Sequence, residues 1–196
     1  MNKFFFLILV SIAILGNNSF PQTFGIGGGL STVTGPDAYT NDITSGGTGF
    51  SSGYHLGAKL KFEIPLSPIK PFGFVNYTHF SNDQSTPLGD ITISQSIWSL
   101  GGGGEYNLFP GPVSPYIAVN VAYNNIGDLN IDGGDIVLEN SGSKSRFGGG
   151  IGIGAELTML VIGLDASITY NFLNWIGKDS GEETVTIISY NLTVLL

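Results

Sequence analysis

The sequence has no cysteine and few charged residues, and each shortage excludes a class of protein. Without cysteine, the 196-residue chain can form no disulfide framework, no thiolate metal site and no cysteine nucleophile. Only 11% of its residues are charged, and 7 basic side chains stand against 15 acidic ones. An acidic chain is a poor ligand for phosphate backbones, so we expect no nucleic-acid partner. The length fits a single domain stabilised by packing and hydrogen bonds.

Long apolar runs are also missing beyond the N-terminus. Met1-Asn2-Lys3 supplies a short positive segment before an apolar run from Phe4 to Leu15. This pattern is typical of a secretory signal peptide, and the run is shorter than the ~20 residues of a spanning helix. We predict that residues 1–22 are a signal peptide cut between Ser19 and Thr23, with a retained anchor as the alternative. Residues 23–196 then form the mature domain, which contains no run long enough for a membrane helix.

What the sequence does contain is apolar and polar residues alternating with a period of two. Near the C-terminus, Tyr190, Leu192 and Val194 alternate with Asn191 and Thr193. Such alternation predicts a β-strand with one apolar and one polar face. The same pattern recurs along the chain. The segments predicted as strands are 23–33, 52–64, 71–80, 91–106, 115–124, 147–157, 163–172 and 184–196.

The connections between these segments alternate in length. Short ones fall at 65–70, 108–114 and near Leu160, whereas 34–50, 81–90, 126–144 and 175–183 are longer and rich in turn residues. Short turns on one rim and long loops on the other are typical of an up-and-down antiparallel meander. The predicted fold class is therefore all-β, an eight-stranded antiparallel up-and-down barrel.

The small residues on the polar faces decide which way the barrel's side chains point. Glycine recurs in runs such as 101–104 and 148–150, and small residues cannot fill a dry core. A soluble lipocalin-like barrel would need the apolar set inside. A transmembrane barrel needs it outside, facing lipid, with closed hydrogen bonding throughout. We therefore predict a transmembrane β-barrel. The outward aromatic residues expected at the membrane interfaces are Tyr54, Trp98, Tyr123, Tyr170 and Tyr190.

With these features, the whole mature chain resembles the eight-stranded bacterial outer-membrane β-barrel proteins, the class that contains the transmembrane domain of outer membrane protein A. The resemblance implies secretion to the outer membrane, assembly by the barrel-assembly machinery, contact with membrane lipid and lipopolysaccharide, and a monomer. It implies a structural or surface-interaction role, with any specificity in the outer loops. The alternatives are an enzyme and a narrow pore. The chain ends in Val194-Leu195-Leu196 rather than an aromatic residue, so assembly would depend on the alternation and on Tyr190.

Several ionisable residues fall on the inner, small-residue faces of the predicted strands. Each lies in the half of its strand nearest a short connection. Charges inside a narrow lumen must pair, because an isolated buried ion is very costly. We predict a salt-bridge network that plugs the barrel at its short-turn end, with a narrow ion path as the alternative. Its members are Lys59, Lys61, Glu63, Glu105, Glu156 and Asp165.

Residues 128–139 have the spacing of a calcium-binding loop, in which oxygen ligands converge around a glycine at the sixth position. No predicted helices flank this loop, so a solvated turn rich in aspartate, asparagine and glycine is the alternative. The possible Ca²⁺ is the one cofactor that the sequence suggests. Its candidate ligands are Asp128, Asn130, Asp132 and Glu139.

A short motif, His79-Phe80-Ser81-Asn82, stands at the end of the third predicted strand. It resembles the His-x-Ser-Asn element of the outer-membrane lipid A deacylases, eight-stranded barrels whose serine and histidine face lipid. The resemblance implies that His79 would activate Ser81 as a nucleophile. The element comes late in the chain of that enzyme family, and no acidic residue clearly orients His79 here. An interfacial histidine with no catalytic role is the alternative.

Overall fold

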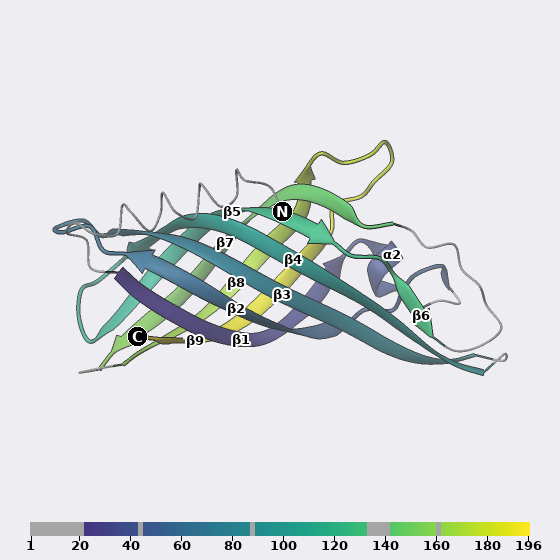
Figure 1. Ribbon diagram of the computed structural model, residues 1–196, viewed down its shortest axis with the longest axis horizontal. Coiled ribbons are helices and arrows are strands. Elements are labelled where there is room, and N and C mark those ends of the chain that lie inside the picture. The colour runs from purple at the N-terminus through teal and green to yellow at the C-terminus, as the bar shows by residue number, and fades with distance from the viewer. Residues whose placement is uncertain (1–21, 43–44, 87–88, 133–141, 160–161) are drawn as a thin grey trace, which may run out of the picture.

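The computed structural model describes residues 22–42, 45–86, 89–132, 142–159 and 162–196. Most of them lie in long, tilted strands that run between the two ends of the molecule (Figure 1). These strands begin and end close to the predicted segments. They are β1 (Gln22–Gly35), β2 (Ser52–Phe62), β3 (Ile69–Thr86), β4 (Gly89–Asn107), β5 (Val113–Ile126), β7 (Lys144–Thr158), β8 (Gly163–Ile176) and β9 (Thr186–Leu195).

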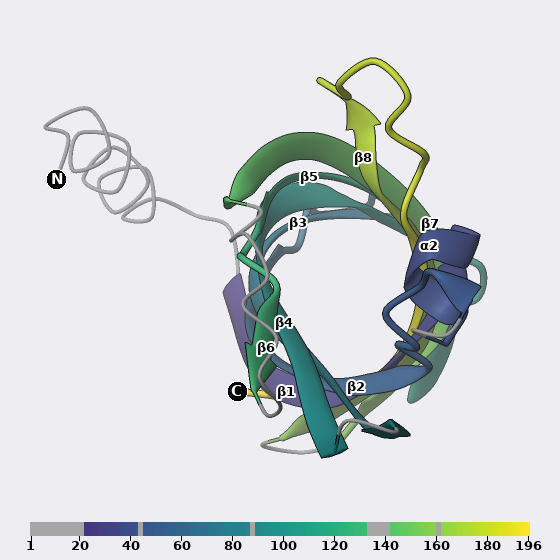
Figure 2. The same ribbon diagram turned by 90° about the vertical axis from the view of Figure 1, so that its right-hand side faces the viewer.

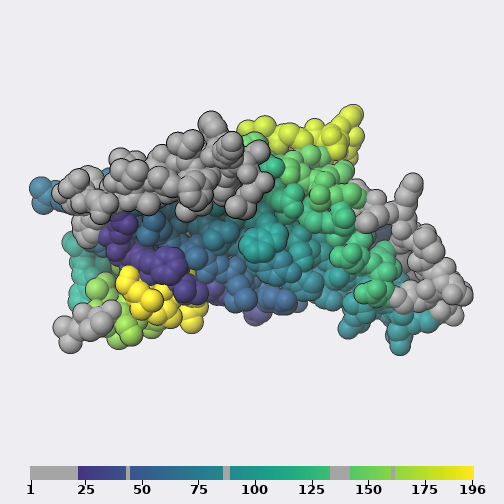
Figure 3. Space-filling view, viewed as in Figure 1, coloured from purple at the N-terminus to yellow at the C-terminus, as the bar shows by residue number. Residues whose placement is uncertain are grey.

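The eight long strands form a closed antiparallel barrel. Neighbours in the chain pair with one another, and β1 closes the ring on β9 through contacts from Gly25↔Leu195 to Gly35↔Thr186. Figure 2 shows the ring end-on, and Figure 3 shows β1 in purple beside the yellow C-terminal residues on the surface. The predicted fold class, an eight-stranded up-and-down barrel, is confirmed. Because the ring is closed, its wall has no unpaired edge, as a bilayer requires.

Over most of the barrel wall, apolar side chains point out and small or polar ones point in. Val119 on β5, Ile168 on β8 and Leu192 on β9 are 61%, 46% and 58% exposed. A water-soluble barrel would bury these residues. The predicted outward direction of the apolar faces is therefore confirmed. Of the five aromatic residues predicted at the membrane interfaces, Tyr170 is partly buried. The other four are exposed: Tyr54, Trp98, Tyr123 and Tyr190.

Glycine on the inner wall allows neighbouring strands to bend closely past each other. A β-carbon at Gly29 of β1 would collide with the backbone oxygen of Tyr190 on β9, and one at Gly27 would collide with that of Leu192. Any larger residue at these positions would push β1 away from β9. The glycine-rich pattern that identified the inner face thus also permits the tight curvature of a small barrel.

The prediction of a long loop at 81–90 was wrong. The structure continues β3 to Thr86 and begins β4 at Gly89, and the two strands stay in register from Ile69↔Tyr106 to Thr86↔Gly89. A short strand, β6 (Asn130–Asp132), pairs with β4 at residues 92–94. Serine, asparagine and aspartate favour turns locally, but pairing with β4 overrides that preference.

An apolar cluster fills the barrel at the end that carries the long loops. It draws residues from most of the strands and from the β1–β2 connection, and Tyr39 of the short helix α2 (Asp37–Thr40) packs against it. No described helix has the length and apolar character needed to cross a membrane. The buried members of the cluster are Val33, Phe50, Phe80, Ile93, Ile97, Ile126, Leu173, Val185 and Ile187.

The predicted signal peptide lies outside the described residues, apart from Gln22, which begins β1.

Candidate functional site

Four strands bring the predicted ionisable residues together inside the barrel, near its short turns. Lys59 and Lys61 lie two positions apart on β2 and therefore point to the same face. Glu105, Glu156 and Asp165 project from β4, β7 and β8, and pairing sets Glu156 directly opposite Asp165. Two carboxylates side by side repel each other unless cations lie between them.

Lys61 supplies that cation at the centre of the cluster. Its Nζ atom lies 2.8 Å from Glu105 Oε2, 3.2 Å from Glu156 Oε2 and 2.6 Å from Asp165 Oδ2. Its side chain is only 1% exposed. A buried ammonium has three N–H donors, and here three carboxylates surround it. Lys61 is thus the central residue of the network.

Two further lysines flank this centre. Lys59 Nζ lies 3.1 Å from Glu105 and 3.2 Å from Asp165. Lys70 Nζ on β3 lies 3.4 Å from Glu156 Oε2 and 3.2 Å from Glu63, which is at the exposed edge. Lys70 was not predicted as a member of the network, because the sequence pattern placed it in the short connection at 65–70 and not in a strand. Its signal in the sequence was its place directly before the predicted strand 71–80.

Tyr116 on β5 completes the cluster. Its hydroxyl donates a hydrogen bond to Asp165 Oδ1 at 2.5 Å, and Lys61 Nζ lies 5.2 Å from the centre of its ring. The cluster thus joins β2, β3, β4, β5, β7 and β8 across the lumen. Three lysines offset three buried carboxylates, so this network leaves no buried charge unpaired among the described residues; that it plugs the short-turn end stays a prediction.

Between the charged cluster and the apolar cluster lies a cavity of about 100 Å³. Asparagine, serine and threonine side chains line it together with His55, and apolar side chains such as Phe72 and Phe74 complete its wall. The Nδ1 atom of His55 lies 2.9 Å from Ser31 Oγ, and that oxygen lies 3.0 Å from Ser189 Oγ. The space has room for several water molecules, since one needs roughly 10–15 Å³ by this measure. The lumen therefore consists of a charged end, a middle lined by polar and apolar side chains, and an apolar outer end.

At the outer end, Asn174 fastens the β8–β9 connection to the barrel. It is fully buried; its Nδ2 donates to Glu182 Oε1 at 2.7 Å and its Oδ1 accepts from Val185 N at 2.7 Å. Arg146 Nη2 lies 2.7 Å from both Glu182 Oε2 and Asp179 Oδ2. These contacts give residues 177–185 a defined conformation. These contacts could not be predicted from the sequence, because they join a strand end to a loop that is distant from it along the chain.

The pKa of Glu182 predicts how this loop responds to pH. Its hydrogen bonds from Arg146 hold the pKa of the carboxyl at about 2, below the ordinary value of 4.5. A depressed folded-state pKa stabilises the folded loop above pH 4.5, and that contribution is lost as the pH falls toward 2. We expect the hydrogen-exchange protection of the Val185 amide to fall over this range. Glu182→Gln should lower protection at neutral pH and flatten the pH dependence.

The matched control for this prediction is Glu183→Gln, since the neighbouring residue contributes its backbone oxygen rather than its side chain to the Asn174 contact. It should leave protection of Val185 nearly unchanged. Equal effects of the two substitutions would show that the Arg146–Glu182 pair does not order the loop.

His79 and Ser81 both lie on the outer side of β3, but the structure joins His79 to a different serine. His79 Nδ1 lies 3.0 Å from Ser96 Oγ on β4, and Tyr77 OH lies 2.8 Å from the same oxygen. Residues two apart on one strand are separated by ~7 Å. Within the described residues, no hydrogen bond joins His79 to Ser81. Catalysis by this pair stays a prediction.

The predicted calcium loop is only partly described. Asn130 and Asp132 belong to β6, where they pair with Ser94 and Thr92 of β4, and Asp128 precedes them. Glu139 lies outside the described residues. The described part of the chain contains no group of three or more histidine, aspartate or glutamate residues placed to hold a metal. A calcium site at 128–139 stays a prediction, which calcium-dependent protection from proteolysis would test.

Comparisons with known proteins agree with this architecture. Solved structures similar to the chain include Neisserial surface protein A, at 16% identity, a TM-score of 0.61, and coverage of 91% of this chain and 99% of that one. A major outer membrane protein from Thermus thermophilus shares 12% identity with a TM-score of 0.56, covering 89% of this chain and 98% of that one. These similarities show the fold alone.

No curated protein matches the sequence significantly. The model of the family described as "Outer membrane protein beta-barrel domain" matches residues 5–194, which is nearly the whole chain. With that match and its closed eight-stranded barrel, the chain belongs to the outer membrane protein β-barrel domain family.

Proposed function

We propose that the protein is an outer-membrane barrel with a structural or surface-interaction role, whose outer loops carry its specificity. The observation that supports this best is that paired charges and an apolar cluster occupy the lumen, whereas the outer end carries a separate cavity. A cavity of about 300 Å³ lies at the outer end, lined by Ala38 and Tyr39 of α2, Gln95 of β4, and Glu182 and Val185 of the β8–β9 connection. That volume is at the lower limit for small-molecule sites.

Orientation on the cell decides whether this cavity can meet a partner. We expect a membrane-impermeant amine reagent to label exposed Lys178 on intact cells and to leave the inward Lys61 unmodified. The protein should sediment with outer membranes, and unheated samples should migrate differently from heated ones in detergent gels. Labelling of Lys178 only after the membrane is broken, or recovery of the protein in a soluble fraction, would contradict the proposal.

A narrow pore is the alternative role, and the side chains that occupy the lumen make ion conduction unfavourable. The ion-paired cluster crosses the barrel at one end and the apolar cluster fills the other. An ion would have to displace paired charges and then enter an apolar region, which is costly. We expect purified protein in planar bilayers to show no steady conductance. Steady open channels would contradict the closed lumen.

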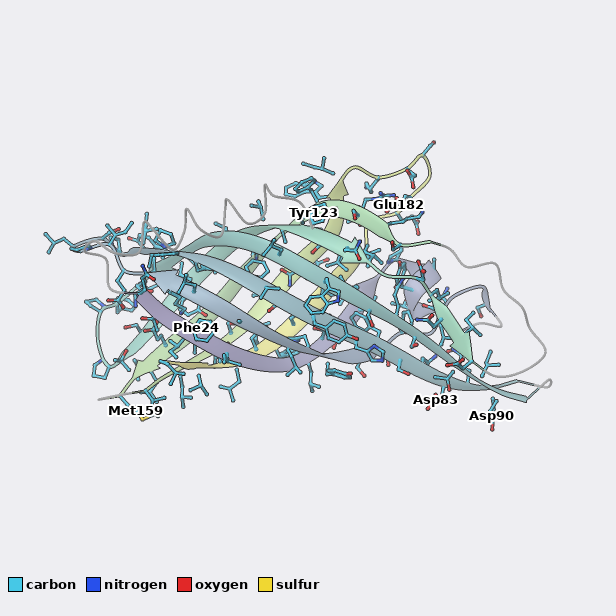
Figure 4. The ribbon with its side chains drawn as sticks, in the orientation of Figure 1. Phe24, Asp83, Asp90, Tyr123, Met159 and Glu182 are labelled. Atoms are coloured by element: carbon cyan, nitrogen blue, oxygen red, sulfur yellow. The ribbon has the colours of Figure 1, made fainter. Side chains whose placement is uncertain are left out.

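We also propose that the protein is secreted with cleavage of residues 1–22, is inserted by the barrel-assembly machinery and works as a monomer among outer-membrane lipids. Carboxylates such as Asp83 and Asp90 stand at the outer end (Figure 4), where they would repel lipopolysaccharide phosphates unless divalent cations bridge the two. Binding of lipopolysaccharide to the purified barrel should therefore require Mg²⁺. Binding that is unchanged in a chelator would rule out the bridge.

A further inference from the structure

The short turns at the closed end carry exposed apolar side chains where a water-facing turn would carry polar ones. Leu66, in the β2–β3 turn, is 107% exposed, and Phe109, in the β4–β5 turn, is 68% exposed. Met159 and Ile162 flank the β7–β8 turn and are also exposed. Figure 4 places Met159 at the end of the molecule opposite Asp83 and Asp90. The chain thus has an apolar rim at one end and an acidic rim at the other.

The backbone geometry at Leu66 also suggests that this turn is not simply exposed to water. Its φ is +64°, a region that favours glycine and is unfavourable for leucine. The side chain is fully exposed and packs against no described residue that would offset this cost. Burial of the Leu66 side chain in an apolar medium outside the protein would offset the cost of its backbone conformation.

Charge is nearly absent from these turns. Among the described residues of the three turns, Glu63 alone is charged, and it is ion-paired with Lys70 at 3.2 Å. Apart from Glu63, the described turn residues therefore have no charged side chain that would resist transfer into a less polar medium.

The rim is continuous with the lipid-facing surface of the strands. Exposed Ile64, Tyr106 and Ile117 connect the turns to the apolar band above them. Tyr54 on β2 and Ile64 just beyond its end are ten positions apart, which corresponds to ~33 Å along a strand and roughly 25 Å across a membrane at the usual tilt. Because the apolar band of such barrels is also about 25 Å tall, Ile64 falls at its inner boundary and Leu66 lies two residues beyond it.

The apolar residues also surround the barrel. Going round the ring, the ends of β3 and β2, β1 and β9, β8 and β7, and β5 and β4 meet at this rim. Phe24 and Leu196 supply exposed apolar side chains at the β1–β9 pair, as the turns do at the others. A single protein partner would cover one side, whereas lipid surrounds all sides. We propose that this rim is inserted into the interfacial region of the inner, phospholipid leaflet and anchors the barrel at a fixed depth.

The absence of cysteine makes the test direct. Single variants Leu66→Cys and Phe109→Cys of the full chain, labelled with a fluorophore, are reconstituted in phosphatidylcholine and phosphatidylethanolamine vesicles. Nitroxides attached at shallow depth to the lipids should quench both probes severalfold more than they quench Asp90→Cys on the outer hairpin. Iodide, present on both sides of the membrane, should quench the Asp90→Cys probe severalfold more than the rim probes.

Val119→Cys provides the reference for a deep lipid-facing position, and migration of unheated samples in detergent gels verifies that each variant has folded. Rim probes that respond to iodide as Asp90→Cys does would overturn the proposal, because the vesicles contain no protein that could otherwise cover the rim. That result would leave the outer-membrane assignment intact and would direct attention to a protein partner on the inner side.

Discussion

Replacing Lys61 by methionine is expected to lower the free energy of unfolding by about 3–5 kcal/mol, the usual cost of removing one partner from a buried ion pair. Methionine keeps most of the side-chain volume, so the loss would report charge rather than a cavity. The substitution leaves Glu105, Glu156 and Asp165 close together, with only the flanking Lys59 and Lys70 to offset them. Urea unfolding in lipid vesicles, followed by tryptophan fluorescence, measures the effect.

The control for this prediction is Lys144→Met. Lys144 pairs with Asp179 at 3.4 Å on the exposed outer end, and such pairs contribute under about 1 kcal/mol. Adding Glu105→Gln to Lys61→Met should recover part of the loss, because it removes one uncompensated negative charge. If Lys61→Met cost no more than Lys144→Met, the cluster would have to be hydrated rather than a sealed plug.

Arginine in place of Val119 is expected to cost about 2–4 kcal/mol of folding free energy in a bilayer, because a cation on the lipid face is most costly near the midplane. Val119 is exposed in the middle of β5, so the larger side chain meets no steric obstacle in the barrel. Reversible folding into vesicles across a urea series measures the cost.

The matched control is Asn125→Arg, on the same strand and the same outer side but close to the outer end. There the expected cost is about 0–1 kcal/mol, since an arginine near the interface reaches water and headgroups. Equal costs at the two positions would mean that no depth-dependent apolar medium surrounds the barrel.

Most of the barrel could be predicted from the sequence, because the direction in which each side chain points follows from the alternation within its own strand. Alternation along β9 assigned Leu192 outward and Thr193 inward, and the glycine runs identified the inner face. The same parity placed Lys59, Lys61, Glu105, Glu156 and Asp165 inside, where the structure pairs them. A narrow lumen leaves such residues no other partners.

The features that sequence reasoning missed depend on pairing between distant segments. The outer part of the β3–β4 hairpin contains Ser81 and Asp83, which favour turns in isolation, and only pairing with β4 makes it a strand. Asn174 acquires its role from Val185 and Glu182 across a loop. The apolar cluster at the outer end was likewise invisible, because inward apolar residues such as Phe80 and Ile187 interrupt an otherwise polar face.

The central claim is that apolar side chains of this barrel face lipid and the polar ones are enclosed. A spin-label scan of single cysteines through residues 117–122 of β5 in vesicles tests it most directly. The structure predicts high collision rates with oxygen dissolved in the lipid at positions 117, 119 and 121, and low rates at 118, 120 and 122. The opposite phase, or no alternation at all, would contradict the account.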